Sequence, residues 1–190
     1  GTFDELSSYY DAVLNLDKST YKSSNDEPTP IACVNEMIDK IPCELWKKND
    51  LSILDPCCGN GNFALPVLYK LLEYHDKKNV LENMLEFNDI NETRLDNVKR
   101  IFCSDKYDLQ VSSYNYLEHN TDKKYDLIMA NPPFNQKDWR ADNELLDDPR
   151  WRGYEVPQKG NANYAWILNM VSKLSDNGVA GFILANGALS

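Results

Sequence analysis

The sequence predicts an α/β domain built on a doubly wound, mostly parallel β-sheet. Short apolar segments typical of buried strands alternate with segments of helical period along most of the 190 residues. A turn with two glycines follows the first of these strands, and polar side chains follow later ones, as in α/β folds that bind ligands at the carboxyl edge of the sheet. Because strands alternate with helices, we expect parallel pairing through right-handed crossovers.

The N-terminal part of the chain predicts two helices joined by a polar segment. Phe3–Leu16 has apolar residues at helical spacing, which predicts the first helix. Lys18–Pro30 is polar, with Ser, Asn and two prolines, and is typical of an ordered loop or linker. In Ile31–Ile41, isoleucine or valine recurs every three to four residues, which predicts an amphipathic helix that ends before Pro42.

The next four elements are expected to be strand, helix, strand and helix. Leu51–Asp55 is short and mostly apolar, which predicts a buried strand. Phe63–Tyr74 predicts a helix, and Pro66 is compatible with its first turn. Leu85–Ile90 predicts the second strand, and Asn91 is a suitable N-cap for a helix that extends through residue 102. The inward residues of that helix are expected to be Leu95, Val98 and Ile101 or Phe102.

The last elements are expected to be two strands, a helix and a fifth strand. Leu109–Ser112 predicts the third strand, and the apolar segment Tyr125–Ala130 predicts the fourth. Ala162–Leu174 predicts a helix, Asp176–Gly178 a turn, and Val179–Ala185 the fifth strand. The inward face of this helix is expected to hold Ile167, Met170, Val171 and Leu174.

Composition restricts the classes of function. The 30 acidic and 20 basic residues give a net charge of -10, which argues against broad electrostatic binding of nucleic acid by this segment alone. A local basic patch, or contacts made by another domain or subunit, would still allow such binding. Five cysteines without a CxxC pair and two histidines predict reduced thiols rather than a zinc site or any other metal site. Without an apolar run of about 20 residues or a secretory signal, we expect a cytoplasmic protein.

The turn after the first strand carries one acid and two glycines. Gly59 and Gly61 permit a tight turn in which the backbone comes close to a ligand. Asp55 places a carboxylate at the end of the strand, where it could meet a cation such as an α-ammonium group. Together with Ala64, the glycines also satisfy a loose dinucleotide-binding spacing, which is weak by itself. A purely structural turn is the alternative.

A second acid, Asp89, ends the second strand. In nucleoside-binding α/β folds a carboxylate at this place accepts the hydroxyl groups of a ribose. Ile90 would then pack on the face of an adenine ring. The alternative is that Asp89 only opens the next helix. Both roles are compatible, because Asn91 is available as the cap.

Asn131-Pro132-Pro133-Phe134 follows the fourth strand and suits chemistry at a weakly nucleophilic aromatic amine. The side-chain oxygen of Asn131 and the carbonyl of Pro132 could accept the two amine hydrogens and so aim the nitrogen lone pair. Pro133 lacks an N–H and stiffens the turn. Phe134 offers a flat face for an extruded base. The alternative is a surface turn, but the glycine turn and Asp89 nearby favour a site.

With these motifs in this order, the chain resembles the gamma class of S-adenosylmethionine-dependent DNA adenine-N6 methyltransferases. It is similar to the modification subunits of type I restriction systems and to related stand-alone modification enzymes. The resemblance implies a Rossmann-like methyltransferase fold, S-adenosyl-L-methionine as cofactor, and methyl transfer to the N6 amine of adenine. The segments that carry it are Thr29-Pro30, Asp55–Phe63, Asp89, Asn131–Phe134, Asn163–Trp166, Gly178 and Leu184–Gly187.

The resemblance also assigns residues to cofactor and catalysis. The family usually has an Asp after the third strand that binds the adenine amine of the cofactor, and Asn115 is the nearest candidate here. The implied catalytic residues are Asn131, Pro132, Pro133 and Phe134. The implied cofactor-binding residues are Thr29, Pro30, Asp55, Pro56, Gly59, Gly61, Phe63, Asp89, Ile90 and Asn115.

Compared with the family, the sequence lacks the strands that follow the fifth and the separate target-recognition region. We therefore expect a fold truncated after the fifth strand, within a fragment of a longer protein. Residues 1–28 would form an N-terminal helix and linker, and residues 29–190 the catalytic domain. Contacts to DNA would come largely from regions that are missing here. Specificity or restriction subunits are possible partners, and no membrane is expected.

Three other functions are compatible with parts of the pattern. Methylation of an RNA base or of a protein glutamine uses similar motifs, although the glutamine enzymes more often have Tyr where this chain has Phe134. A non-catalytic cofactor-binding module would leave the intact Asn-Pro-Pro-Phe unexplained, and so would a nicotinamide-dependent oxidoreductase.

The segment 135–161 interrupts the alternation of strands and helices. A loop of this length in a small domain is usually functional or mobile, so we expect a mobile lid or a substrate-facing loop. Trp139, Trp151 and Arg152 could contact DNA there, and ordinary loop packing is the equal alternative.

Overall fold

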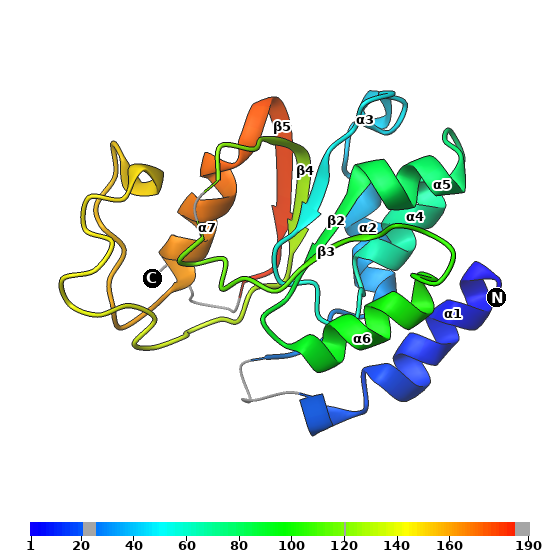
Figure 1. The fold of residues 1–190 in the computed structure, drawn as a ribbon, viewed down its shortest axis with the longest axis horizontal. Coiled ribbons are helices and arrows are strands. Elements are labelled where there is room, and N and C mark those ends of the chain that lie inside the picture. The colour runs from blue at the N-terminus through cyan, green and yellow to red at the C-terminus, as the bar shows by residue number, and fades with distance from the viewer. Residues whose placement is uncertain (21–25, 120, 185–190) are drawn as a thin grey trace.

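The computed structural model describes residues 1–20, 26–119 and 121–184. A sheet of five parallel strands in the order β3-β2-β1-β4-β5 forms its centre (Figure 1). The predicted doubly wound α/β class is therefore confirmed. The order of the strands reverses between β1 and β4, which is the place where open α/β sheets bind ligands. The strands are β1 Ile53–Asp55, β2 Leu85–Asn88, β3 Gln110–Ser112, β4 Tyr125–Ala130 and β5 Leu174–Phe182.

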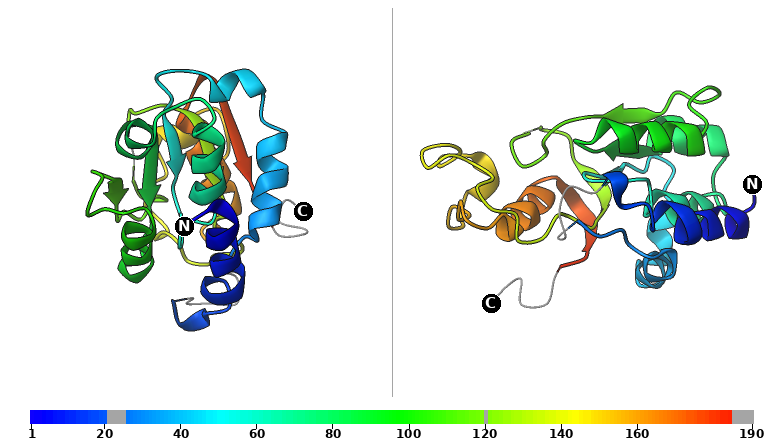
Figure 2. Two further views of the ribbon diagram at one scale, coloured as in Figure 1. Left: turned by 90° about the vertical axis from the view of Figure 1, so that its right-hand side faces the viewer. Right: turned by 90° about the horizontal axis from the view of Figure 1, so that it is seen from below.

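The helices lie on both faces of this sheet, as Figures 1 and 2 show. α1, α2, α4 and α6 cover one face, and α7 lies on the other beside the long loop that follows β4. The α-helices are α1 Phe3–Tyr9, α2 Ile31–Asp39, α3 Cys43–Trp46, α4 Ala64–Leu71, α5 Lys77–Asn79, α6 Glu92–Ile101 and α7 Asn163–Ser172. Short 3-10 segments occupy Lys18–Thr20 and Pro149–Trp151, and π-helical segments extend α1 over Tyr10–Leu14 and α5 over Val80–Met84.

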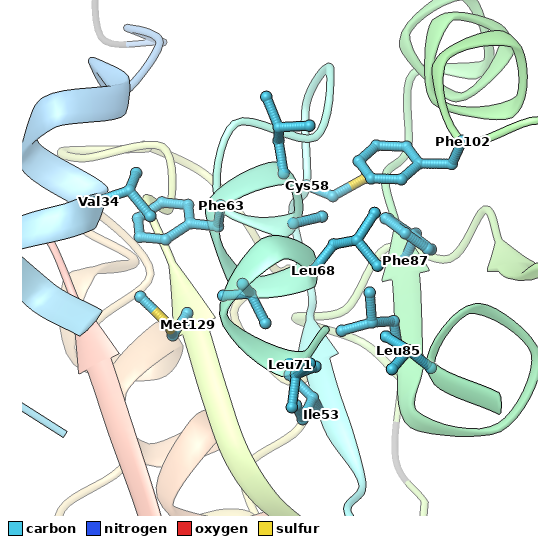
Figure 3. Packing of buried hydrophobic residues seen from close by; sticks show 14 of the residues in the cluster. Val34, Ile53, Cys58, Phe63, Leu68, Leu71, Leu85, Phe87, Phe102 and Met129 are labelled. Carbon is cyan, nitrogen blue, oxygen red and sulfur yellow. The ribbon is translucent and has the colours of Figure 1, made fainter. Parts of the chain in front are cut away.

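Alternation along the central strands divides the core into two layers. Ile53, Leu127 and Met129 belong to the cluster under α1, α2, α4 and α6. Leu54 and Ile128 belong to a second cluster, under α7. Figure 3 shows part of the first cluster, in which Val34, Phe63 and Met129 lie close together. Because both faces are covered, the strands carry apolar side chains on each side, as the sequence pattern predicts.

The caps and bounds explain why most of the predicted elements form. The Oδ1 atom of Asn91 accepts hydrogen bonds from the backbone N–H groups of Thr93 and Arg94, so the predicted cap of α6 is confirmed. Pro66 lies in the first turn of α4, where its missing N–H costs nothing. Three short helical segments between residues 43 and 84, and the 3-10 turns, were not predicted.

Two details of the predicted C-terminal part are wrong. Val171 is 44% exposed and Leu174 lies in β5, whereas Met170 is buried as predicted, together with Ala165, Trp166 and Asn169. The predicted turn Asp176–Gly178 lies inside β5 as an irregularity. Leu174 pairs with Tyr125 but Val179 already pairs with Leu127. Ala185, Asn186 and Gly187 lie outside the described residues.

The long loop after β4 is packed through its aromatic side chains. Trp139 is 5% exposed and Trp151 is 2% exposed, and both belong to the cluster under α7. Their indole N–H groups donate to the carbonyl oxygens of Gln158 and Leu145 at 2.8 and 2.7 Å. These contacts favour the packing alternative for the two tryptophans over contact with DNA. Arg152 is exposed, and its contact with DNA stays a prediction, as does motion of the loop.

Two further findings concern membranes and thiols. Among the described residues, no helix is both long enough and apolar enough to cross a bilayer. All five cysteines have free thiols, and burial raises the pKa of the Cys57 and Cys58 thiols well above the usual range.

Candidate active site

The two glycines of the turn after β1 have different structural roles. Both have positive φ angles, +56° at Gly59 and +91° at Gly61. A Cβ atom added to Gly61 would lie 2.8 Å from Phe102 Cε2 and 3.1 Å from Tyr10 Oη, whereas one added to Gly59 would meet no atom within 4 Å. Packing therefore requires glycine at 61, and the space above Gly59 is open to a ligand.

Residues from the N-terminal segment hold this turn from behind. The hydroxyl group of Tyr10 donates to the carbonyl oxygen of Asn60 at 2.6 Å. The amide of Asn62 donates to Asn15 Oδ1 at 2.7 Å and to the carbonyl oxygen of Thr29 at 2.8 Å. The first helix thus supports the turn directly. The domain boundary after residue 28 stays a prediction.

Asp89 links the end of β2 to the glycine turn. Its Oδ2 accepts a hydrogen bond from the backbone N–H of Gly59 at 2.8 Å, and its Oδ1 accepts from that of Asn91 at 2.8 Å. Asp89 is 4% exposed, and burial raises the pKa of its carboxyl group, although the two hydrogen bonds oppose this. The side chain therefore faces the glycine turn, and Asn91 caps the helix.

Asp55 is a buried acid with one unsatisfied oxygen. Its Oδ1 accepts a hydrogen bond from the backbone N–H of Cys57 at 3.2 Å. Its Oδ2 has no hydrogen-bond partner within the described part of the chain. Burial, followed by the negative charge of Asp89, raises the pKa of Asp55 well above its usual range. A ligand cation beside this carboxyl group would favour its ionised form.

Asn131 is held in one orientation by the segment before α2. Its Nδ2 donates to the carbonyl oxygen of Glu27 at 2.7 Å and to Thr29 Oγ1 at 2.9 Å. Because both amide hydrogens are used in this way, Oδ1 is the atom left to accept a hydrogen bond from a substrate. Thr29 therefore helps to fix the side chain of Asn131, and it also lies near the glycine turn.

Two adjoining cavities lie at this edge of the sheet. The larger, of about 130 Å³, is lined by predicted site residues from four strand ends: Pro56, Asp89, Ile90, Asn115, Asn131 and Pro133. The smaller, of about 30 Å³, is lined by Thr29, Gly59, Phe63 and Asn131 among others. Five predicted site residues, Pro30, Asp55, Gly61, Pro132 and Phe134, line neither of the two.

Asn88 is a site residue that sequence analysis missed. It is 1% exposed, and its Nδ2 donates to the carbonyl oxygens of Pro56 and Tyr114, both at 2.9 Å. Its Oδ1 accepts from Ser112 Oγ at 2.9 Å and from the backbone N–H of Tyr114 at 2.8 Å. One side chain at the end of β2 thus connects β3 and the loops after β1 and β3. The signal in the sequence was an amide at the end of an apolar strand, directly before Asp89.

The loop after β3 forms one wall of the larger cavity and is fixed from the other face of the sheet. The carbonyl oxygen of Tyr116 accepts hydrogen bonds from the side chains of Arg150 and Asn169. Asn115 also lines the cavity, and its Oδ1 accepts from the backbone N–H of Leu117 at 3.2 Å. In the part of the chain that the structure describes, no three His, Cys, Asp or Glu side chains are grouped so as to hold a metal ion.

Two curated proteins similar in sequence to this chain are methylase subunits of type I restriction enzymes. A methylase subunit of the type I restriction enzyme MjaIX from Methanocaldococcus jannaschii is 38% identical over 73% of this chain and 26% of its own length. The HindI methylase subunit from Haemophilus influenzae is 33% identical over 100% of this chain and 42% of its own length. The chain thus spans less than half of either relative.

A solved structure shares the fold. It is the methyltransferase subunit of a type I restriction-modification system from Streptococcus thermophilus, with a TM-score of 0.66 and 18% identity. The match covers 88% of this chain and 34% of that one. The family model described as N-6 DNA Methylase matches residues 2–190, nearly the whole sequence. This chain therefore belongs to the N-6 DNA methylase family.

Proposed function

We propose that this chain is the catalytic core of a restriction-modification enzyme that transfers a methyl group from S-adenosyl-L-methionine to the N6 amine of adenine in DNA. The orientation of Asn131 is the observation that carries the proposal. Its amide nitrogen is engaged by Glu27 and Thr29, so that its oxygen remains as an acceptor at the carboxyl end of β4. An acceptor fixed in that way suits an amine substrate.

The residues around the two cavities fit the proposed cofactor. Asp89 would accept the ribose hydroxyl groups, and Ile90, which is 63% exposed beside the larger cavity, would cover the adenine. Asp55 lines neither cavity, but it lies at the end of β1 between them and the core, and its unpaired Oδ2 suits the α-ammonium group. When bound, the cofactor supplies an electrophilic methyl group. The residues proposed to bind it are Thr29, Pro30, Asp55, Pro56, Gly59, Gly61, Phe63, Asp89, Ile90 and Asn115.

The Asn-Pro-Pro-Phe segment would act on the base. The two amine hydrogens would be accepted by Asn131 Oδ1 and by the carbonyl oxygen of Pro132. These acceptors align the nitrogen lone pair and stabilise the positive charge that develops on nitrogen. Pro133 restricts the backbone that carries the second acceptor. The half-buried Phe134 would stack against the extruded base.

The proposal for DNA as substrate rests on the relatives. Two of them are named as methylase subunits of type I restriction enzymes, and both are more than twice as long as the matched region. A net charge of -10 is compatible with DNA binding if the main contacts come from other regions or from specificity and restriction subunits. Such subunits are therefore part of the proposal.

The test compares three substrates and two asparagine variants. Full-length protein with its partner subunits is incubated with labelled S-adenosyl-L-methionine and duplex DNA, RNA or protein extract. We expect label on DNA, identified as N6-methyladenine by mass spectrometry. Asn131→Ala should lower the turnover rate by about a hundredfold or more, as loss of one positioned polar group does in other enzymes. Asn143→Ala, at an exposed loop position, is the matched control.

Two outcomes would contradict the proposal. Equal turnover in the Asn131→Ala and Asn143→Ala proteins would show that Asn131 is not catalytic. Label on RNA or on protein glutamine, with none on DNA, would favour the alternative substrates.

A further inference from the structure

One wall of the larger cavity carries two polar groups to which no role has yet been assigned. Gln136 lies just beyond Phe134, and Trp166 lies on α7. Both residues line the cavity together with Asp89 and Asn131. The Oε1 atom of Gln136 and the Nε1 atom of Trp166 are buried and have no hydrogen-bond partner among residues 1–20, 26–119 and 121–184. Buried polar atoms are rarely left unpaired, so each is a candidate contact for a ligand.

The two atoms are complementary in their hydrogen-bonding roles. An amide oxygen only accepts, and an indole N–H only donates. Adenine presents the matching arrangement on one edge, where the 6-amine donates beside a ring nitrogen that accepts. Guanine and hypoxanthine carry an oxygen at the 6-position, which would face the oxygen of Gln136 unfavourably.

The opposite wall of the larger cavity holds the other candidate acceptor for the 6-amine of adenine. Asn115 is the residue expected from the family resemblance to bind the adenine amine of the cofactor. Its Oδ1 accepts the backbone N–H of Leu117, so only one lone pair of that oxygen is left for a ligand. Gln136 Oε1 has no such bond.

We propose that Gln136 and Trp166 recognise the adenine of the cofactor, an inference that rests on the proposed function. Gln136 Oε1 accepts a hydrogen bond from the 6-amine, and Trp166 Nε1–H donates one to the neighbouring ring nitrogen. The cofactor base fits better than the target base because the same cavity is lined by Asp89, Ile90 and Asn115, from the ends of β2 and β3. Asn131 and Pro133 line it as well, at its border with the catalytic segment, but Phe134, the expected stacking partner of the target base, does not.

The test uses two cofactor analogues whose bases differ in the 6-substituent, an amine or an oxygen, and in N1, which accepts a hydrogen bond in adenine and donates one in hypoxanthine. Binding of S-adenosylhomocysteine and S-inosylhomocysteine to the full-length protein is measured by titration calorimetry without DNA, so that no target base contributes. The wild type should prefer the adenosyl compound by about tenfold or more, because the inosyl compound leaves buried groups unpaired. Gln136→Leu should reduce that preference to about twofold, since the hydrogen bond that it removes contributes a factor of about five. Trp166→Phe should weaken adenosyl binding by about fivefold while retaining the aromatic ring.

Asn143→Leu, at an exposed loop position, is the matched control, and it should leave the preference unchanged. If Asn115→Leu abolishes the preference and Gln136→Leu retains it, the inference is overturned. If the wild type folds but binds neither analogue, the proposed cofactor is wrong and this inference falls with it. Circular dichroism and thermal melting establish folding. Should Trp166→Phe fail to fold, the comparison of Gln136→Leu with Asn115→Leu still decides.

Discussion

Replacing Gly61 by alanine should destabilise the fold far more than replacing Gly59, although the two glycines share one turn. The added methyl group at 61 would lie 2.8 Å from Phe102 and 3.1 Å from Tyr10. Those side chains are 3% and 0% exposed, so neither can move into solvent. Overpacking of this kind costs about 1–3 kcal/mol. Backbone strain at φ +91° adds roughly 1–3 kcal/mol.

The less flexible unfolded chain of the alanine variant offsets roughly 0.4–1 kcal/mol of this sum, so the expected loss for Gly61→Ala is about 3 kcal/mol. At Gly59 the added methyl group meets no atom within 4 Å, and only the left-handed backbone is unfavourable. That costs about 1–2 kcal/mol, offset by roughly 0.4–1 kcal/mol from the less flexible unfolded chain. The net loss for Gly59→Ala should be about 1 kcal/mol.

Urea denaturation of the ligand-free proteins, followed by tryptophan fluorescence, measures both losses. Binding of S-adenosylhomocysteine by calorimetry provides the complementary comparison. Gly59→Ala should weaken binding, because its methyl group enters the open space proposed for the cofactor. If Gly61→Ala is as stable as Gly59→Ala, then Phe102 and Tyr10 relax around the methyl group and the packing argument is incorrect. Undiminished binding by Gly59→Ala would show that the ligand does not use that space.

Two further predictions concern the polar groups of the site. Because burial raises the pKa of Asp55 and a bound ammonium favours its ionised form, affinity for S-adenosylhomocysteine should be greatest above that raised pKa and fall as the pH drops through it. Calorimetry over a pH series should show this loss in the wild type and a weak, nearly pH-independent affinity in Asp55→Asn; a flat wild-type profile would exclude the carboxylate as the ammonium ligand. Asn88→Ala removes four hydrogen bonds of a buried side chain and should destabilise the fold by about 2–4 kcal/mol in urea denaturation. A loss below about 1 kcal/mol would mean that the loops after β1 and β3 hold their positions without the hydrogen bonds of Asn88.

Elements with strong local signals were predicted well. β4 begins and ends where its apolar run does, and Asn91 caps α6 through bonds to residues two and three positions away. The face of α7 was predicted wrongly because apolar periodicity favours Ile167 and Val171. The buried face instead contains Asn169, whose amide finds partners on the loop after β3 and on Lys173. A polar side chain can be buried when it has such hydrogen-bond partners, and these partners cannot be identified from the sequence alone.

The irregularity in β5 has a similar origin. Asp176–Gly178 has the composition of a turn, and the first two of these residues are exposed, yet the strand continues on both sides of them. A Cβ atom at Gly178 would lie 2.7 Å from the carbonyl oxygen of Tyr125, so the close approach of β4 requires glycine here. Only the neighbouring strand makes that requirement visible.

The sequence by itself determined the order of strands and helices, and it placed an acid, two glycines and Asn-Pro-Pro-Phe at one edge of the sheet. Those features follow from local periodicity and from the rule that parallel strands end at the same edge. The tertiary structure decided which atoms remain available. The Asn131 oxygen is left as an acceptor because the amide is bound by Glu27 and Thr29, more than 100 positions earlier in the chain. Hydrogen bonds between such distant residues depend on packing, which local sequence patterns do not encode.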